Sequence, residues 1–233
     1  MQTLLKWARK CSQVFMGLVI FSISFANPLV GQEAEWSEIA KWQGKGYKST
    51  ETFHIPSNEW RILWDTKPGK HGDMNFQIFV YEASGSLASV VANVIGKDKD
   101  SSYMRGSGDY YLIINTGQPY QVIIEAKGQV KKLESHSAAK WKKVVSWEGK
   151  GIKNTETIRI SSQEWRISWS TKPSEYGEMN FQIFVYKADG TLVTMAANVI
   201  GKDEDSSYIR GSGDYYFTIN TGQIYQVIVE AKL

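Results

Sequence analysis

The sequence predicts an all-β protein made of two tandem antiparallel β-sandwich domains, jelly-roll-like, which follow a cleaved signal peptide. Short runs that alternate between apolar and polar residues dominate the chain, as in half-buried strands, and no window shows the apolar stripe of an amphipathic helix. Aromatic residues make up 13% of the 233 residues, a share that suits strands. A unit of about 90 residues also occurs twice, and a repeat of that length is a domain.

The first 26 residues predict a secretory signal peptide. Basic residues come first, the apolar run 14–25 follows, and small residues precede a cleavage point at Asn27. The alternative is an uncleaved membrane anchor, but the run is about a dozen residues long and a membrane-spanning helix needs roughly 20. The single cysteine, Cys11, leaves with this segment. We therefore expect a secreted or periplasmic protein with no disulfide and no membrane span in the mature chain.

The duplication sets the domain organisation. Trp42 aligns with Trp147 and segment 74–81 aligns with segment 179–186, so counterparts lie 105 residues apart. About two-thirds of the aligned positions are identical. The polar, small-residue stretch between the two copies is typical of a linker. We expect a signal peptide at 1–26, a first sandwich at 27–127 (repeat 1), a linker at 128–139 and a second sandwich at 140–233 (repeat 2).

Period-two runs separated by turn residues predict the strands of each repeat. In segment 59–64, Trp60, Ile62 and Trp64 share one face while polar residues occupy the other. Gly, Pro, Ser and Asn punctuate the runs, as in tight turns. In repeat 1 we expect strands at 52–55, 59–64, 75–81, 87–95, 101–105, 109–115 and 120–126, and core positions for Trp36, Trp42, Trp60 and Trp64. Seven or eight strands in about 90 residues favour a sandwich with jelly-roll order.

Two of these runs resemble a known family. Residues 108–115 (GDYYLIIN) and the following run 120–125 are similar to the closing strands of bacterial prepeptidase C-terminal (PPC)-like domains. Run 75–81, followed by the turn Ser84-Gly85, is similar to their central hairpin. The resemblance implies a small secreted jelly roll that serves as an accessory or binding module of exported enzymes.

Composition and residue types argue against several function classes. A net charge of +3 gives no field strong enough to capture nucleic acid. His54 and His71 are replaced by Arg159 and Tyr176 in the second copy, and no Ser/His/Asp pattern is present. We therefore expect a protein that is not an enzyme. The alternative is a secreted, glycan-active hydrolase that uses duplicated carboxylates.

Acidic residues form the first candidate site. An Asp-x-Asp-Ser-Ser segment occurs in both copies, and an aspartate follows the next turn. Several oxygen ligands from one loop can bind calcium. The candidate metal ligands are Asp98, Asp100 and Asp109 in repeat 1 and Asp203, Asp205 and Asp214 in repeat 2. A structural calcium is one interpretation and a plain polar hairpin loop is the other, and no other cofactor is expected.

Aromatic residues form the second candidate site. Within the strands that carry them, they alternate with core residues, so both faces of those strands are partly apolar. The residues are Phe79, Tyr81 and Tyr111 in repeat 1 and Phe184, Tyr186 and Tyr216 in repeat 2. If they point outward together, they form a platform for a sugar or a partner protein. The other interpretation is that a loop or the other domain covers them.

These observations lead to a functional hypothesis. We expect a secreted, non-enzymatic binding or adhesion protein with two equivalent sandwich modules. The expected ligand is a surface polysaccharide or an extracytoplasmic protein, and two modules on one chain would strengthen binding to an extended target. The hydrolase is one alternative, and a structural envelope protein that assembles through its sandwich edges is another.

Overall fold

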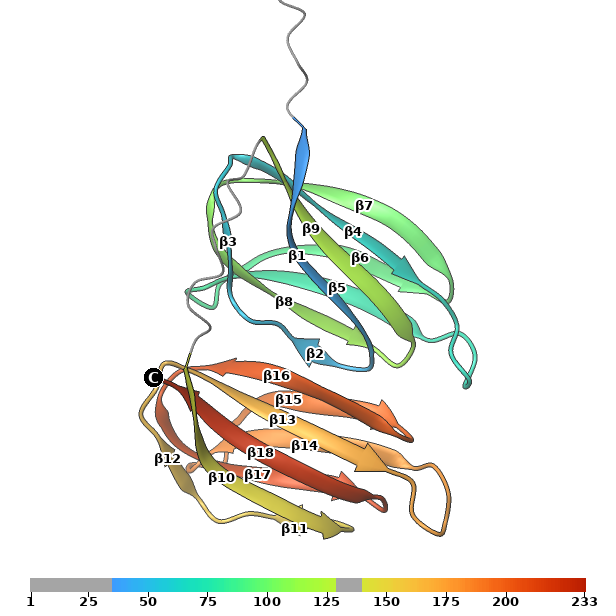
Figure 1. Cartoon of the computed structure of the whole chain (residues 1–233), viewed down its shortest axis with the longest axis vertical. Helices are drawn as coiled ribbons and strands as arrows, with labels where there is room; N and C mark the ends of the chain where they lie inside the picture. The colour runs from blue at the N-terminus through green and yellow to red at the C-terminus, as the bar shows by residue number, and fades with distance from the viewer. Residues whose placement is uncertain (1–34, 129–139) are drawn as a thin grey trace, which may run out of the picture. The chain divides into compact units, whose positions relative to one another are not determined.

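The computed structural model describes residues 35–128 and 140–233, and every regular element in these ranges is a strand (Figure 1). The described residues of both repeats belong to one compact unit. The predicted signal peptide and linker residues 129–139 lie outside the described residues. No described segment is a helix with the length and apolar character needed to cross a membrane.

The two repeats contain the same series of strands. Repeat 1 comprises β1 (Trp36–Lys45), β2 (Lys48–Ser49), β3 (Phe53–Ile55), β4 (Glu59–Thr66), β5 (Asn75–Glu82), β6 (Leu87–Ile95), β7 (Asp98–Arg105), β8 (Gly108–Thr116) and β9 (Pro119–Lys127). Repeat 2 comprises β10 (Trp141–Lys150), β11 (Lys153–Asn154), β12 (Ile158–Ile160), β13 (Glu164–Lys172), β14 (Asn180–Lys187), β15 (Leu192–Ile200), β16 (Asp203–Arg210), β17 (Gly213–Thr221) and β18 (Ile224–Lys232).

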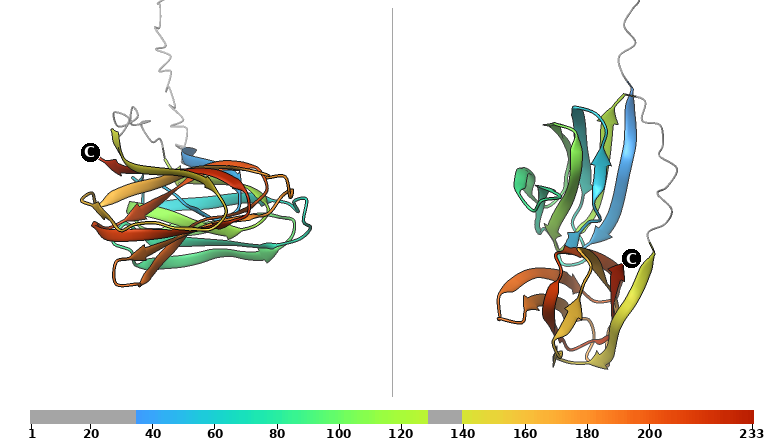
Figure 2. Two further views of the ribbon diagram at one scale, coloured as in Figure 1. Left: turned by 90° about the horizontal axis from the view of Figure 1, so that it is seen from below. Right: turned by 90° about the vertical axis from the view of Figure 1, so that its left-hand side faces the viewer.

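Each repeat is a jelly roll of two facing sheets. One sheet of repeat 1 has the order β1-β9-β4-β7, and the other has the order β2-β8-β5-β6 with β3 also on β8. Repeat 2 has the equivalent orders β10-β18-β13-β16 and β11-β17-β14-β15, with β12 on β17. The first and last strands are neighbours and the chain crosses repeatedly between the sheets, as in a jelly roll. Figure 2 shows the two layers. The predicted fold class is confirmed.

Strand boundaries depart from the prediction where the polarity pattern is irregular. Strand β1 was not predicted, because a register shift between Glu38 and Ala40 interrupts its alternation. Strand β7 begins at Asp98, three residues earlier than expected, because Asp98 pairs with Thr66 of β4 in the ladder. The interpretation of this acidic segment as a hairpin loop is therefore wrong, since the turn comprises only residues 96 and 97.

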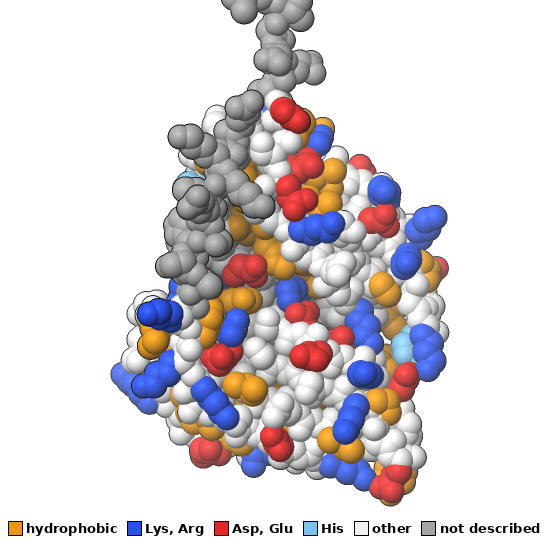
Figure 3. Space-filling view, in the orientation of Figure 1, with side chains coloured by type: hydrophobic (Ala, Val, Ile, Leu, Met, Phe, Trp, Pro, Cys, Tyr) orange, Lys and Arg blue, Asp and Glu red, His pale blue; other side chains and the backbone are white. Residues whose placement is uncertain are grey.

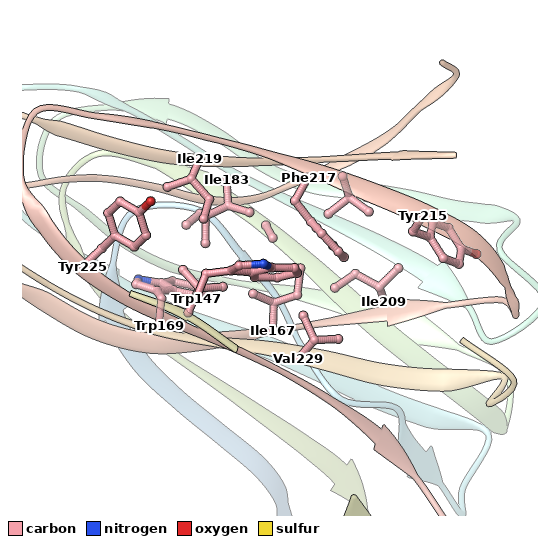
Figure 4. Packing of buried hydrophobic residues seen from close by; sticks show 14 of the residues in the cluster. Trp147, Ile167, Trp169, Ile183, Ile209, Tyr215, Phe217, Ile219, Tyr225 and Val229 are labelled. Atoms are coloured by element: carbon pink, nitrogen blue, oxygen red, sulfur yellow. The ribbon is translucent and has the colours of Figure 1, made fainter. Parts of the chain in front are cut away.

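Large apolar side chains fill the space between the sheets of each repeat. Trp60, Ile62 and Phe76 are fully buried in repeat 1, and Figure 4 shows the equivalent packing in repeat 2. The expectation that Trp36 belongs to this core is wrong. Trp36 lies on an outer face, where the Arg61 guanidinium carbon sits 4.3 Å from the ring centroid. That ring gains a cation–π contact instead of burial.

A buried glutamine ties three segments together at one end of each sandwich. Gln118 is fully buried, and its Nε2 donates to Thr66 Oγ1 and to the carbonyl of Gly96, both at 2.7 Å. Its Oε1 accepts a hydrogen bond from the Met74 amide. Gln223 makes the same bonds in repeat 2. The side chain joins the end of β4, the β6–β7 turn and the start of β5.

Replacing this glutamine tests its role. Gln118→Leu keeps the approximate volume but leaves buried polar partners unpaired, so the free energy of unfolding should fall by about 2–4 kcal/mol. Denaturant unfolding measures the change. The control is Gln121→Leu, at a partly exposed position of β9. Equal decreases in the free energy of unfolding of the Gln118→Leu and Gln121→Leu variants would contradict the structural role assigned to Gln118.

Candidate functional site

Three rows of side chains cross the outer face of the five-stranded sheet in each repeat. The register of β8, β5 and β6 sets the rows, since residues opposite one another share a face. In repeat 1 the tyrosine row is Tyr111, Tyr81 and Leu87, the apolar row is Ile113, Phe79 and Val90, and the amide row is Asn115, Gln77 and Asn93. In repeat 2 the same rows are Tyr216, Tyr186 and Leu192; Thr218, Phe184 and Met195; and Asn220, Gln182 and Asn198.

The tyrosines of each row stack on one another. The ring centroids of Tyr81 and Tyr111 are 5.2 Å apart and the ring planes differ by 13°. Tyr186 and Tyr216 are 5.1 Å apart with an angle of 11°. All four side chains are partly exposed, as are Phe79 and Phe184. The structure thus places the six aromatic residues singled out in the sequence on the two outer faces, three on each.

The amide row is a hydrogen-bonded ladder that the sequence argument missed. Asn115 Nδ2 donates to Gln77 Oε1 at 3.0 Å, and Gln77 Nε2 donates to Asn93 Oδ1 at 3.2 Å. Repeat 2 has the same ladder, at 3.1 Å and 3.3 Å. The bonds orient the amides in one direction, so donors and acceptors lie at fixed positions beside the aromatic rings. The available signal was the recurrence of these polar residues between core residues in both copies.

The two amide rows reach a common groove. A cavity of about 430 Å³ is lined by Asn75 and Asn115 from repeat 1 and by Asn180 and Asn198 from repeat 2. Asn115 is one end of the first ladder and Asn198 is one end of the second. The amide row of repeat 1 therefore approaches the amide row of repeat 2 at this groove.

The two repeats meet through unlike edges of the same kind of sandwich. The buried Lys48 of β2 pairs with Asp205 of β16, and its Nζ also donates to the carbonyl of Ser206 at 3.0 Å. The Ser49 amide donates to Ser207 Oγ at 3.2 Å. We call residues 46–52 the lysine edge of repeat 1. We call the β15–β16 side the aspartate edge of repeat 2.

Arg210 makes the two tyrosine rows unequal. Its guanidinium carbon lies 3.6 Å from the ring centroid of Tyr111, and its Nη2 donates to the carbonyl of Thr50 and to Thr52 Oγ1. Burial lowers the pKa of Arg210 and raises the pKa of Tyr111. Among the described residues, no cation lies over Tyr216. The interpretation that the other domain covers a ring therefore applies to Tyr111.

The candidate metal ligands of repeat 1 are held separately. Asp98 Oδ2 accepts a hydrogen bond from Trp64 Nε1 at 2.6 Å, and Asp100 Oδ1 accepts one from the next backbone amide. Asp109 lies in the other sheet and pairs with His54 Nδ1 at 2.7 Å. The structure does not bring these three carboxylates together.

The candidate ligands of repeat 2 are also dispersed. Asp205 pairs with Lys48 across the contact between repeats, and Asp214 pairs with Arg159 at 2.9 Å. Burial raises the pKa of Asp203, and the nearby Lys45 opposes the shift. Among the described residues, no group of three or more acidic, histidine or cysteine side chains is placed to hold a metal ion. A bound calcium stays a prediction.

Two carboxylates that recur in both repeats, those of Glu59 and Asp109, form ion pairs at the surface. Glu59 accepts a hydrogen bond from Lys127 Nζ at 3.0 Å. His54 and Asp109 line a cavity of about 1360 Å³ that also includes Glu164 of repeat 2. The side chains of His54 and Asp109 are 55% and 57% exposed, so water solvates their pair.

Acidic and basic side chains are interspersed over the described surface seen in Figure 3. The chain has 27 basic and 24 acidic residues, and they form no large field of one sign in this view. The face seen in this view therefore does not favour a polyanionic partner.

Comparisons with known proteins find similarity only to solved structures. No family model matches the chain, and no curated protein matches it. The exported protein XepA of PBSX has 9% identity and a TM-score of 0.29, and the match covers 84% of this chain and 86% of that one. A chain from the triple jelly-roll fold and turret assembly of an archaeal virus has 12% identity and a TM-score of 0.24, with coverage of 86% and 59%. A cupin 2 conserved barrel domain protein from Leptotrichia buccalis has 10% identity and a TM-score of 0.23, with coverage of 88% and 92%. Similarities this low say nothing about function.

The contact between repeats predicts different roles for two equivalent arginines. Arg210→Ala removes a buried guanidinium together with its hydrogen bonds and ring contact, and should lower the free energy of unfolding by about 2 kcal/mol. Arg105→Ala changes the exposed counterpart in repeat 1 and should stay within about 0.5 kcal/mol of the parent. Thermal unfolding at low protein concentration measures both. A smaller effect at Arg210 than at Arg105 would contradict the described contact.

Proposed function

We propose that this chain is an exported, non-enzymatic binding protein that recognises a surface polysaccharide through the outer faces of its five-stranded sheets. The observation that carries the proposal is the pairing of a stacked tyrosine row with an ordered amide row, present in both repeats. The two repeats provide two copies of one recognition surface.

The chemistry of the rows matches that of a sugar chain. Aromatic rings pack against the apolar faces of pyranose rings, and tyrosine keeps a hydroxyl available for hydrogen bonding. A side-chain amide both donates and accepts, which suits the paired hydroxyl groups of a sugar. Because the ladder fixes each amide, binding a sugar costs little side-chain ordering.

The groove supports an extended ligand rather than a single sugar. Asn115 and Asn198 both line it, and they end the amide rows of repeat 1 and repeat 2. A polysaccharide that follows both rows engages two modules at once, and the second contact gains from the high effective concentration. Arg210 adds a guanidinium beside Tyr111, so the module in repeat 1 differs from the one in repeat 2.

Export and the absence of catalysis are parts of this proposal. Export is supported by the predicted signal peptide at 1–26 and by a chain without cysteine after Cys11. A non-catalytic role is supported by Glu59 and Asp109, whose carboxylates are engaged in separate exposed ion pairs.

A glycan-array screen of the purified exported protein, followed by titration of the best polysaccharide, tests the function. Tyr186→Ala should weaken binding at least tenfold, because it removes a stacked ring from repeat 2, and Tyr81→Ala should weaken binding through repeat 1. The control is Tyr176→Ala, which removes a tyrosine that is 70% exposed and lies outside the rows. Equal affinity of the parent and the Tyr186→Ala variant would contradict the proposal.

A chelator separates the calcium question from the binding question. Binding that survives chelation would remove any need for an ion at Asp98 or Asp203. No polysaccharide binding with or without calcium would reject the saccharide ligand and leave a protein ligand for the same faces.

A further inference from the structure

The contact inside the chain uses one edge of each repeat and leaves the other edge of each repeat free. Repeat 1 contributes its lysine edge, and repeat 2 contributes its aspartate edge. Since the repeats share one fold, repeat 2 has its own lysine edge at residues 151–157 and repeat 1 has its own aspartate edge at β6–β7. Among the described residues, no hydrogen bond or ion pair joins either free edge to the other repeat.

The free edges keep the charged contact residues and several of their neighbours, while Tyr47 and Ser49 are replaced by Ile152 and Asn154. On the lysine edges, Gly46, Lys48, Thr50 and Tyr111 correspond to Gly151, Lys153, Thr155 and Tyr216. On the aspartate edges, Asn198, Asp205, Ser207 and Arg210 correspond to Asn93, Asp100, Ser102 and Arg105. The two free edges therefore present a lysine and an aspartate that match each other as Lys48 and Asp205 do.

The backbone of the free lysine edge is already shaped for close contact. Gly46 has a φ of +88°, and a Cβ there would lie 2.6 Å from the Asn198 carbonyl oxygen, so the contact needs glycine. Gly151 has a φ of +90°, yet nothing lies within 4 Å of the position of its Cβ. Repeat 2 thus keeps the same turn with open space in front of it.

Exposed apolar side chains mark both free edges. Ile152 is 72% exposed, whereas its counterpart Tyr47 is 8% exposed and contacts repeat 2. Ile95 is 76% exposed, whereas its counterpart Ile200 is partly covered, and its carbonyl accepts a bond from Lys45. Each free edge therefore exposes an apolar residue whose counterpart is covered in the contact within the chain.

We propose that the lysine edge of repeat 2 docks on the aspartate edge of repeat 1 in a second copy of this chain, so that copies assemble head to tail. In this contact Lys153 pairs with Asp100 and Arg105 covers Tyr216, as Lys48 and Arg210 do within the chain. A contact between unlike edges leaves one of each free at the ends of every dimer, so assembly continues into a filament or closes into a ring.

At its rim, the proposed contact between two copies is weaker than the contact between the two repeats of one chain. Inside the chain Lys70 pairs with Glu178 at 2.7 Å. In the contact between copies, the positions equivalent to Lys70 and Glu178 are occupied by Glu175 and Asp73. These two carboxylates repel each other. Glu175 also forms an ion pair with Lys150 at 2.6 Å. Lys150 is the counterpart of Lys45, which donates to the Ile200 carbonyl in the contact within the chain. The copies should therefore associate reversibly, and the fraction of chains in assemblies should rise with protein concentration.

This assembly does not depend on saccharide binding. Tyr186 is not among the contact residues, so Tyr186→Ala should leave assembly intact. Lys153 and Asp100 lie outside the three rows, so Lys153→Glu and Asp100→Lys should leave saccharide binding intact. Failure of the glycan screen would therefore leave the present proposal standing, and failure of assembly would leave the proposed function standing.

Sedimentation velocity of the purified exported protein over a concentration series tests the proposal. The parent should form species larger than a dimer. Lys153→Glu and Asp100→Lys each damage one edge, so each should require at least tenfold higher concentration to associate. The control is Lys172→Glu, the same charge change at an exposed residue at the end of β13, and it should assemble like the parent.

Mixing the two edge variants gives the sharpest result. The Lys153→Glu chain keeps its aspartate edge and the Asp100→Lys chain keeps its lysine edge. The two altered edges also carry opposite charges, so an equimolar mixture should associate at a lower concentration than either variant alone. Glu175→Lys should strengthen assembly at least threefold by removing the repulsion at the rim. A parent that stays monomeric at every concentration, variants that assemble like the parent, or a mixture that associates no better than either variant alone would each overturn the proposal.

Discussion

The buried ion pair between Lys48 and Asp205 determines which surfaces of this molecule are covered and which are free. A lysine with a side chain 7% exposed loses most of its hydration and requires a partner. The carboxylate of Asp205, from the other repeat, supplies it and so fixes the register of the contact between the sandwiches. Because the pair joins unlike edges, it also leaves a matching unlike pair of edges on each chain.

Much of the fold follows from alternation of polarity, and the exceptions have physical causes. The runs at β4, β5, β8 and β9 alternate cleanly, and these four strands and β6 were predicted within two residues of their ends. Strand β1 has a bulge that breaks the period, and β7 opens with polar residues that pair with a neighbour without filling the core. Trp36 shows the same limit, because a cation–π contact with Arg61 can hold a tryptophan outside the core.

The candidate site was predictable in part. Strand parity placed Phe79, Tyr81 and Tyr111 on one outer face, but hydrogen bonding between Gln77 and its neighbours depends on strand order, which a single sequence does not reveal. The contact of Arg210 with Tyr111 could not be predicted from the sequence, because the counterpart of Arg210 is also an arginine, Arg105, and it is exposed. The tyrosine row and this arginine are identical in the two repeats, so only the contact between the repeats makes the two tyrosine rows differ.

Residue-resolved hydrogen exchange of the monomeric chain tests this central claim most directly. The Tyr47 amide donates to the Asn198 carbonyl and the Ser49 amide donates to Ser207 Oγ, both across the contact. At a concentration where copies do not associate, these amides should exchange at least tenfold more slowly than their counterparts at Ile152 and Asn154. Equal exchange rates at the paired positions would show that the repeats do not dock through these edges and would contradict the account.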